Sequence, residues 1–411
     1  MTISKTPRDT DEKKTSIVLL TLAASLIYGV SSGIRANYGI LLGPISRASG
    51  VNYASVSFVL AAAQLSFGVM QPVFGVLAMK KSSAFVLRWG SLLMFAGLLW
   101  LPFCKSFWTL LIALGLLLPA GTAALAFGIV MSALAPKLPR SSSSAASGIV
   151  TASAGVGSTV FAPAMQALAA AAGLFGTMIF LSIPALLLFP VSLYLCHPVS
   201  GAVPEEKHDE PSKLAPLVRE AVRSRDYIFL LAGFFTCGFH MAIIETHFYT
   251  QIIACDFPER IAALALSVYG IAAIAGAVIS GGLCGRFAMK TVLAGLYASR
   301  VIIVLAFLLL PKTLVTVFGF AVLLGLTGSA TVPPTSGLTE RLFGAVKLGT
   351  LFGVVFFSHQ IGSFLSAWLG GVCRIATGGY TLIWLADALL SVLAAAVSFN
   401  IQDGREGTSP S

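Results

Sequence analysis

Long apolar stretches dominate this chain, and each is long enough to cross a lipid bilayer as a helix. Such a helix needs roughly 20 consecutive apolar residues. Only 10% of the 411 residues are charged, whereas soluble domains carry about 25%, so the chain cannot be a set of soluble domains. We see none of the ~10-residue alternating segments that are typical of membrane barrels. The sequence therefore predicts an all-α membrane protein.

Twelve stretches of this kind are expected, six on each side of one long polar interruption. They cover residues 16–42, 54–78, 83–103, 107–133, 145–170, 173–196, 227–252, 261–284, 291–311, 314–337, 348–372 and 380–401. The predicted organisation is a tail (1–15), a six-helix bundle (16–196), a linker (197–226), a second six-helix bundle (227–401) and a second tail (402–411).

The linker carries a helical pattern of its own. Leu214, Leu217, Val218 and Val222 recur at helical spacing among basic residues. This pattern predicts a short amphipathic helix on the membrane surface. An accidental periodicity in a solvated linker explains it equally well.

The net charge of +10 follows from topology. If the N-terminus lies inside, most Lys and Arg residues fall in inside segments, and few fall in outside segments or within helices. The outside ones are Arg47, Lys105, Arg260, Lys312 and Arg374; those within helices are Arg35, Arg88 and Arg300. This distribution satisfies the positive-inside rule, so we expect both termini in the cytoplasm and no nucleic-acid partner.

The sequence repeats once, at an offset of 205 to 206 residues. Gly75-Val76-Leu77 returns as Gly281-Gly282-Leu283, Gly148-Ile149-Val150 as Gly353-Val354-Val355, and Gly33-Ile34-Arg35 as Gly238-Phe239-His240. Internal repeats in an apolar chain are typical of secondary transporters, whose substrate site lies between the repeats near the middle of the bilayer.

Other chemistries find little support in the sequence. The six cysteines lack metal-ligand spacing, and we expect neither a metal nor a cofactor. There is no soluble domain, no apparent Ser/His/Asp set and no nucleotide-binding loop. We therefore expect a protein that is not an enzyme and is not driven by ATP.

The six-plus-six pattern resembles the major facilitator superfamily. The signature of that family, G-x-L-a-D-R-x-G-R-K, follows helix 2 and recurs after helix 8. Here the second copy is Gly281-Gly282-Leu283-Cys284-Gly285-Arg286-Phe287-Ala288-Met289-Lys290, and the first is Gly75-Val76-Leu77-Ala78-Met79-Lys80-Lys81. Gly285 and Met79 stand where the family has an acid, so the charge pair of the family is missing or replaced.

Further segments resemble bacterial relatives of the monocarboxylate transporters and the oxalate/formate antiporters. They are Gly33-Ile34-Arg35-Ala36-Asn37-Tyr38-Gly39, Cys237-Gly238-Phe239-His240, Thr246-His247 and Ser358-His359-Gln360. The resemblance implies transport of small organic anions, often with a proton. The monocarboxylate transporters carry an Asp and an Arg in helix 8, whereas the segment from Ser267 to Gly282 holds no charged residue.

Ionisable residues inside a membrane are costly, at about 2.5–3.5 kcal/mol for Arg at a helix centre on insertion scales, and therefore point to function. Arg35 and Arg300 could bind a carboxylate bidentately, or could pair with Glu245, Asp387 or backbone carbonyls as structural residues. The predicted substrate-binding residues are Arg35, Arg300, Asn37, Tyr38, Gln64, His359 and Gln360. Core hydrogen bonding is the alternative for Asn37 and Gln64.

A second group suggests proton transfer. His240 and His247 are seven residues apart and would share one helix face, with Glu245 offset from them. Histidine titrates near neutrality, and a buried Glu can be shifted toward it. We therefore predict His240, Glu245 and His247 as proton-coupling residues. A hydrogen-bonded packing role is the alternative for each histidine, and we expect Asp387 to face a protein neighbour.

These observations together predict a twelve-helix secondary transporter that moves a small organic anion, such as a monocarboxylate, with a proton. We expect a monomer in the inner (plasma) membrane of a bacterium. Efflux of drugs or metabolites is an alternative, in which a large apolar cavity would matter more than the arginines. A membrane sensor or scaffold that does not transport is a second alternative.

Overall fold

The structure is a computed structural model that describes residues 7–197 and 214–402. Its described residues form helices and no strands. The elements before the linker are α1 (Pro7–Ala36), α2 (Tyr38–Ser49), α3 (Tyr53–Lys80), α4 (Ser83–Trp100), η1 (Leu101–Phe103), α5 (Phe107–Leu110), η2 (Leu111–Leu117), α6 (Leu118–Ala124), α7 (Phe127–Leu134), η3 (Ala135–Lys137) and α8 (Arg140–Leu195).

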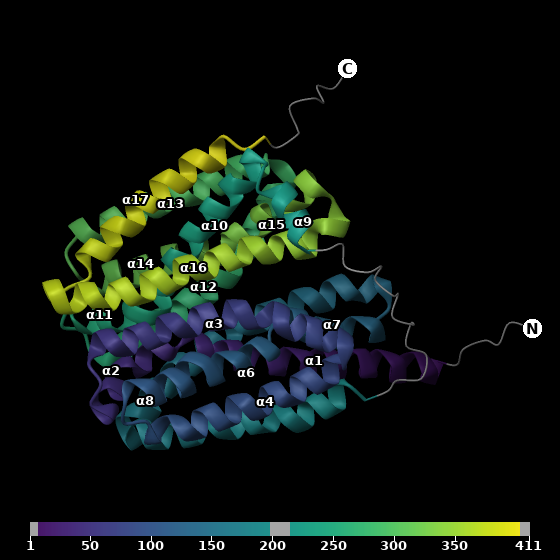
Figure 1. Cartoon of the computed structure of the whole chain (residues 1–411), viewed down its shortest axis with the longest axis horizontal. Helices are drawn as coiled ribbons and strands as arrows, with labels where there is room; N and C mark the ends of the chain where they lie inside the picture. The colour runs from purple at the N-terminus through teal and green to yellow at the C-terminus, as the bar shows by residue number, and fades with distance from the viewer. Residues whose placement is uncertain (1–6, 198–213, 403–411) are drawn as a thin grey trace, which may run out of the picture.

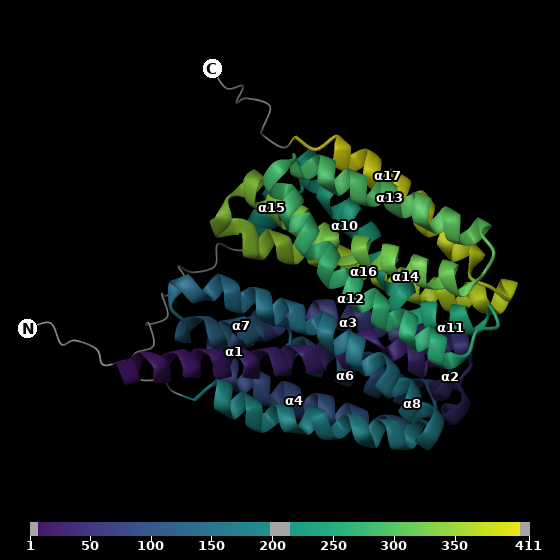
Figure 2. The ribbon, with the colours of Figure 1, turned by 180° about the vertical axis from the view of Figure 1, so that it is seen from behind.

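Those after it are α9 (Leu214–Ala221), α10 (Arg225–Ile243), η4 (Ile244–Phe248), α11 (Tyr249–Ile253), α12 (Glu259–Arg286), α13 (Met289–Leu309), α14 (Leu314–Gly328), η5 (Ser329–Thr331), α15 (Val332–Phe343), α16 (Ala345–Thr377) and α17 (Thr381–Phe399). The helices lie roughly along one axis in two groups, one from each half of the chain (Figures 1 and 2). The start of α1 and the end of α17 lie toward the same end of the molecule, which we call the terminal end; the opposite end is the far end (Figure 1).

Within the described residues, eleven segments are long and apolar enough to cross a membrane. One of them includes most of α8, whose 56 residues contain a single non-helical residue, Gly173, at φ 62°. Lys137, which lies just before α8, donates hydrogen bonds to the carbonyls of Leu195 and His197 at its other end. The chain therefore reverses at Gly173, and α8 has two arms. These arms correspond to the fifth and sixth predicted spans, and the number of twelve spans stays a prediction.

Glycines of the repeat bring helices together inside each bundle. Gly33 of α1 lies against Gly157 of α8, and Gly238 of α10 lies against His359 of α16. A β-carbon at either glycine would overlap the backbone of the neighbouring helix. Small residues allow this close approach, so the repeated glycine positions build two bundles with the same packing.

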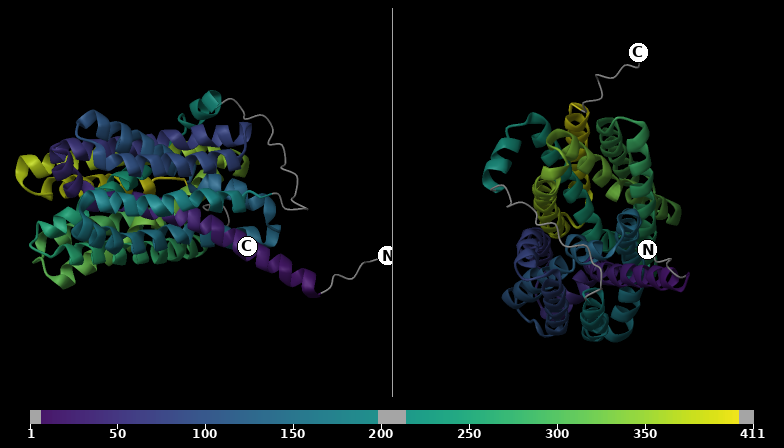
Figure 3. Two further views of the ribbon diagram at one scale, coloured as in Figure 1. Left: turned by 90° about the horizontal axis from the view of Figure 1, so that it is seen from below. Right: turned by 90° about the vertical axis from the view of Figure 1, so that its right-hand side faces the viewer.

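The two bundles contact each other through two antiparallel helix pairs, α3 with α16 and the first arm of α8 with α12. Gly371 of α16 lies against Ser57 of α3 near the far end, and the hydroxyl of Ser267 on α12 donates to the carbonyl of Thr159 on α8 at 2.9 Å. Figure 3 shows the two groups of helices from two further sides.

The same four helices make no such close approach nearer the terminal end. Gly75, Gly148, Gly281 and Gly353 lie there, one on each helix, and nothing stands within 4 Å of where their β-carbons would be. A hollow of about 300 Å³ borders Gly75 and the exposed side chain of Met79. The described interface is therefore tight toward the far end and open toward the terminal end.

A short helix, α9, lies within the predicted linker. Its residues Leu217 and Ala221 are buried in an apolar cluster with Tyr227 and Leu351 of the C-terminal bundle. Its Glu220 carboxylate lies 3.7 Å from the ammonium of Lys347 on α16. Leu217 and Ala221 therefore pack on protein in this structure, while Val222 of the predicted apolar pattern is exposed. A helix on the membrane surface stays a prediction.

Candidate functional site

Four segments that run between the two ends of the molecule are interrupted. α1 ends and α2 begins at Asn37, α6 and α7 are separated at Leu125, α10 passes into the π-helix η4, and α14 passes into the 3₁₀-helix η5. The offset of 205 residues places Asn37 close to η4 and places Leu125 within η5. Interrupted membrane helices at corresponding places in two repeats indicate a binding site.

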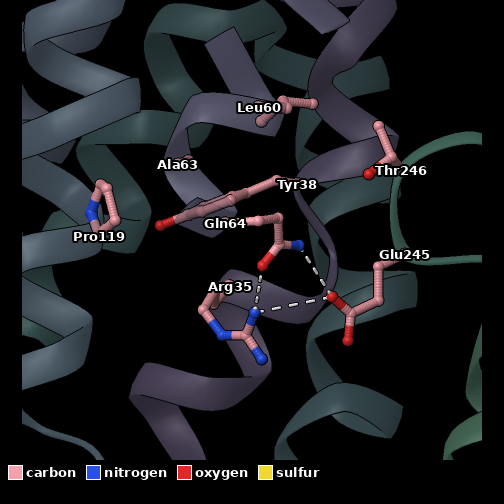
Figure 4. A pocket seen from close by; sticks show the side chains of 8 residues that line it. All are labelled: Arg35, Tyr38, Leu60, Ala63, Gln64, Pro119, Glu245 and Thr246. Carbon is pink, nitrogen blue, oxygen red and sulfur yellow. Dashed lines mark hydrogen bonds and ion pairs between the residues drawn. The ribbon is translucent and has the colours of Figure 1, made fainter. Parts of the chain in front are cut away.

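The first interruption and η4 bring three polar side chains together across the bundle interface (Figure 4). Arg35 of α1 donates from Nη1 to Oε1 of Gln64 on α3 at 2.9 Å, and the same nitrogen lies 3.7 Å from Oε2 of Glu245 on η4. Gln64 also donates from Nε2 to Oε2 of Glu245 at 3.2 Å. Arg35 and Gln64 belong to one bundle and Glu245 to the other, so this triad links the bundles.

The triad lines a small pocket with Tyr38, Leu60, Ala63, Pro119 and Thr246. The pocket encloses about 10 Å³, which is room for about one water molecule and far below the roughly 300–1,000 Å³ of ligand sites. The side chains of Arg35 and Glu245 are 21% and 14% exposed. The hydroxyl of Tyr38 is buried without a hydrogen-bond partner. In this structure the triad therefore binds to itself and leaves no room for an organic ligand.

A second group of cross-bundle contacts lies nearer the far end. The hydroxyl of Tyr53 on α3 lies 3.2 Å from Nδ1 of His247 on η4 and 2.8 Å from the hydroxyl of Tyr380. His247 is also 2.8 Å from the carbonyl of Ala367 through Nε2. Phe58 of α3 packs edge-on against Trp368 of α16. These contacts close the far end above the triad.

Arg300 lies away from the pocket, inside the C-terminal bundle. Its side chain is fully buried, and Nη2 donates to the carbonyls of Thr327 at 2.6 Å and Gly328 at 3.0 Å. Its guanidinium also stands over the ring of Tyr297. These partners match the structural alternative of the sequence analysis. A substrate contact for Arg300 stays a prediction that this geometry does not favour.

The predicted proton-coupling residues do not form one group. Nδ1 of His240 lies 2.7 Å from Oδ2 of Asp387 on α17, and both side chains are fully buried. Glu245 instead faces Arg35, and His247 faces Tyr53. The sequence places His240 and His247 on one helix face, but the π-helical turn η4 changes the spacing of side chains between them, and each has a different partner. Their role in proton coupling stays a prediction.

The remaining predicted site residues lie around the pocket without lining it. Asn37 donates from Nδ2 to the carbonyls of Gly33 and Ser158, so it holds the end of α1. His359 stacks on Phe356 with ring centroids 5.3 Å apart. Gln360 is buried against Gly68, and its Oε1 lacks a partner. Of the predicted substrate-binding residues, Arg35, Tyr38 and Gln64 line the pocket.

Sequence reasoning missed Pro119, Thr246 and the pairing of Tyr53 with His247. Pro119 lies in the fourth predicted span, two residues after the end of the π-helix η2. A proline within a predicted span marks a place where the helix is weakened, and that signal could have pointed to this segment. Tyr53 is the first residue of α3, and no pattern in the sequence around it indicated a contact with His247.

Comparison with known proteins shows which family this chain belongs to. The family model described as "Major Facilitator Superfamily" matches residues 24–321, which is more than half of the chain. The chain belongs to the Major Facilitator Superfamily. It is therefore a multi-pass membrane transporter, as the repeat and the apolar segments predicted.

Two sequence relatives and one solved structure are similar to this chain. An uncharacterized MFS-type transporter, YcxA of Bacillus subtilis, is 29% identical over 166 residues, which cover 39% of this chain and 40% of YcxA. The probable transporter MCH2 of Saccharomyces cerevisiae is 25% identical over 343 residues, covering 81% of this chain and 70% of MCH2. A bacterial homolog of the human lysosomal transporter Spinster, solved inward-facing and unoccupied, shares the fold with a TM-score of 0.73 and 15% identity over 94% of this chain and 97% of that one.

Proposed function

We propose that this transporter moves a small organic anion, such as a monocarboxylate, together with a proton, by alternating access. The triad of Arg35, Gln64 and Glu245 supports the proposal. An arginine recognises carboxylates through paired hydrogen bonds, and in this structure the carboxylate that Arg35 faces belongs to the protein. Glu245 thus occupies the place that a substrate carboxylate would take.

This competition couples the substrate to a proton. While Glu245 is ionised, it neutralises Arg35 and a second anion is disfavoured. When Glu245 takes up a proton, Arg35 loses its ionic partner and can bind the substrate carboxylate. The empty carrier holds one Arg cation and one Glu anion, and the loaded carrier holds one Arg cation and one substrate anion. Both states are neutral, so both can move without exposing a net charge to lipid.

The triad also links substrate binding to the position of the bundles. Arg35 and Gln64 move with the N-terminal bundle and Glu245 with the C-terminal bundle, so opening of the far end must separate them. Protonation of Glu245 weakens that link. We further propose that the terminal end faces the cytoplasm, because most Lys and Arg residues of the described loops lie at that end.

Uptake by purified protein in liposomes tests the proposal. With an alkaline lumen, we expect accumulation of at least one labelled anion among lactate, pyruvate, acetate and oxalate. Arg35→Gln should reduce this uptake by ~10-fold or more, since a hydrogen bond to a charged group is worth about 1.5–3 kcal/mol. Arg88→Gln is the matched control, because Arg88 lies near the terminal end of α4 and away from the pocket.

Glu245→Gln separates the proton from the substrate. We expect it to abolish accumulation driven by the pH gradient and to retain exchange of labelled for unlabelled anion at equal pH. Uptake of none of the four anions would contradict the substrate class. Wild-type activity in Arg35→Gln would contradict the site.

A further inference from the structure

The two helix pairs that join the bundles are symmetric images of each other. Gly68 of α3 lies against the side chain of Gln360 on α16, and Gly155 of α8 lies against the side chain of Ile274 on α12. The repeat offset of 205 to 206 residues relates Gly68 to Ile274 and relates Gly155 to Gln360. The two contacts are therefore the same contact, made once by each half.

Each of these four helices carries a glycine seven residues closer to the terminal end. On α3, Gly75 lies seven residues from Gly68, and on α16, Gly353 lies seven residues from Gln360. On α8, Gly148 lies seven residues from Gly155, and on α12, Gly281 lies seven residues from Ile274. Seven residues are about two helical turns, so each glycine lies on the same helix face as the contact it follows. Ser57 of α3 also contacts Gly371 of α16. Each of these residues lies eleven residues closer to the far end than Gly68 and Gln360, so the same pairing of positions continues along both helices.

None of these four glycines is packed in this structure, because nothing stands within 4 Å of their β-carbon positions. The hollow of about 300 Å³ beside Gly75 is lined by residues of the N-terminal bundle alone. Two open faces, one on each bundle, thus continue an interface that is already formed further along the same helices.

We propose that these two faces dock onto each other when the terminal end closes, with Gly75 meeting Gly353 and Gly148 meeting Gly281. The docked state keeps the register of the far-end interface, so the bundles rock without sliding along each other. Glycine at all four positions lets the backbones come close. This inference rests on alternating access as proposed above, and it is independent of the substrate.

Paired cysteines test the predicted contacts in full-length protein in liposomes. Gly75→Cys with Gly353→Cys, and Gly148→Cys with Gly281→Cys, should each form a disulfide on mild oxidation, because a disulfide needs Cα atoms about 4.4–6.8 Å apart. Mass spectrometry of linked peptides distinguishes these bonds from any made by native cysteines. The control pair Met79→Cys with Gly353→Cys is displaced by one turn, about 6 Å, and should link at least ~5-fold less.

A single substitution tests whether both contacts form in one motion. Gly281→Leu places a large side chain between α8 and α12 and keeps these two helices apart. If both helix pairs close together, this change should also reduce disulfide formation between positions 75 and 353, on α3 and α16, by ~10-fold. The amount of folded protein should stay unchanged, since the leucine meets empty space in this state. Gly282→Leu is the matched control, because Gly282 is equally open but lies on a different face of α12.

Disulfides at both matched pairs, together with the loss caused by Gly281→Leu alone, support the docking register. Stronger linking of the displaced pair would show that the bundles slide, and would overturn the inference. Absence of a disulfide at both matched pairs would overturn it as well. No cargo is needed for these measurements, so failure of the uptake experiment leaves their result intact.

Discussion

At the scale of residues, the charged side chains within the helices lie in two kinds of environment. Arg35 and Glu245 are partly exposed and face each other across two bundles that must separate. Arg300 and Asp387 are fully buried within one bundle. A charge that holds helices of one bundle together is suited to structure, and a charge between moving bundles is suited to coupling.

Arg300→Met should therefore affect stability more than recognition. The carbonyl of Thr327 loses the Arg300 donor, whereas that of Gly328 keeps the hydroxyl of Thr331 at 3.4 Å. A buried group without a partner costs about 1–3 kcal/mol. We expect a melting temperature several degrees lower in detergent. Arg88→Met makes the same change near the end of a helix and should shift it little. An unchanged melting temperature in Arg300→Met, combined with lost transport, would instead favour the substrate contact predicted from the sequence.

At the scale of elements, the far end is closed by main chain as well as by side chains. A β-carbon on Gly39 of α2 would overlap the carbonyls of Glu245 and Thr246 on η4. Backbone atoms cannot rotate away as a flexible side chain can, so any residue larger than glycine here must push the two bundles apart.

Gly39→Ala should shift the protein toward the state that is open at the far end and closed at the terminal end. Disulfide formation between cysteines at positions 75 and 353 should then rise several-fold. Gly379→Ala is the control, since nothing stands within 4 Å of its β-carbon position at the same end. Equal yields in the two variants would show that the Gly39 contact does not hold the far end closed.

At the scale of the whole molecule, the bundles are held together by contacts that do not need the linker. The pairs α3 with α16 and α8 with α12, the triad and the hydrogen bonds of Tyr53 all cross the interface.

Residues 1–205 and 206–411, expressed together as separate chains, should therefore co-purify when one carries a tag. Gly68→Trp in the first half should reduce the yield of the complex, because even a β-carbon added at residue 68 would overlap the side chain of Gln360. Purification of the tagged half alone would contradict this expectation.

The family and the helical fold could be predicted because they follow from local pattern. Apolar length predicts membrane helices, and the offset of 205 to 206 residues predicts two bundles. The same reasoning singled out Arg35, Gln64 and Glu245, because a polar group within an apolar helix is costly enough to need a reason.

The partners of those residues were decided only by the tertiary structure. Periodicity could not show that a π-helical turn at η4 changes the spacing between His240 and His247, nor that Arg300 would meet backbone carbonyls inside its own bundle. A sequence specifies which side chains need a partner, since burial of an unpaired charge is costly wherever it occurs. Which partner each one meets depends on how the helices cross and where they break, and those are properties of the packed molecule.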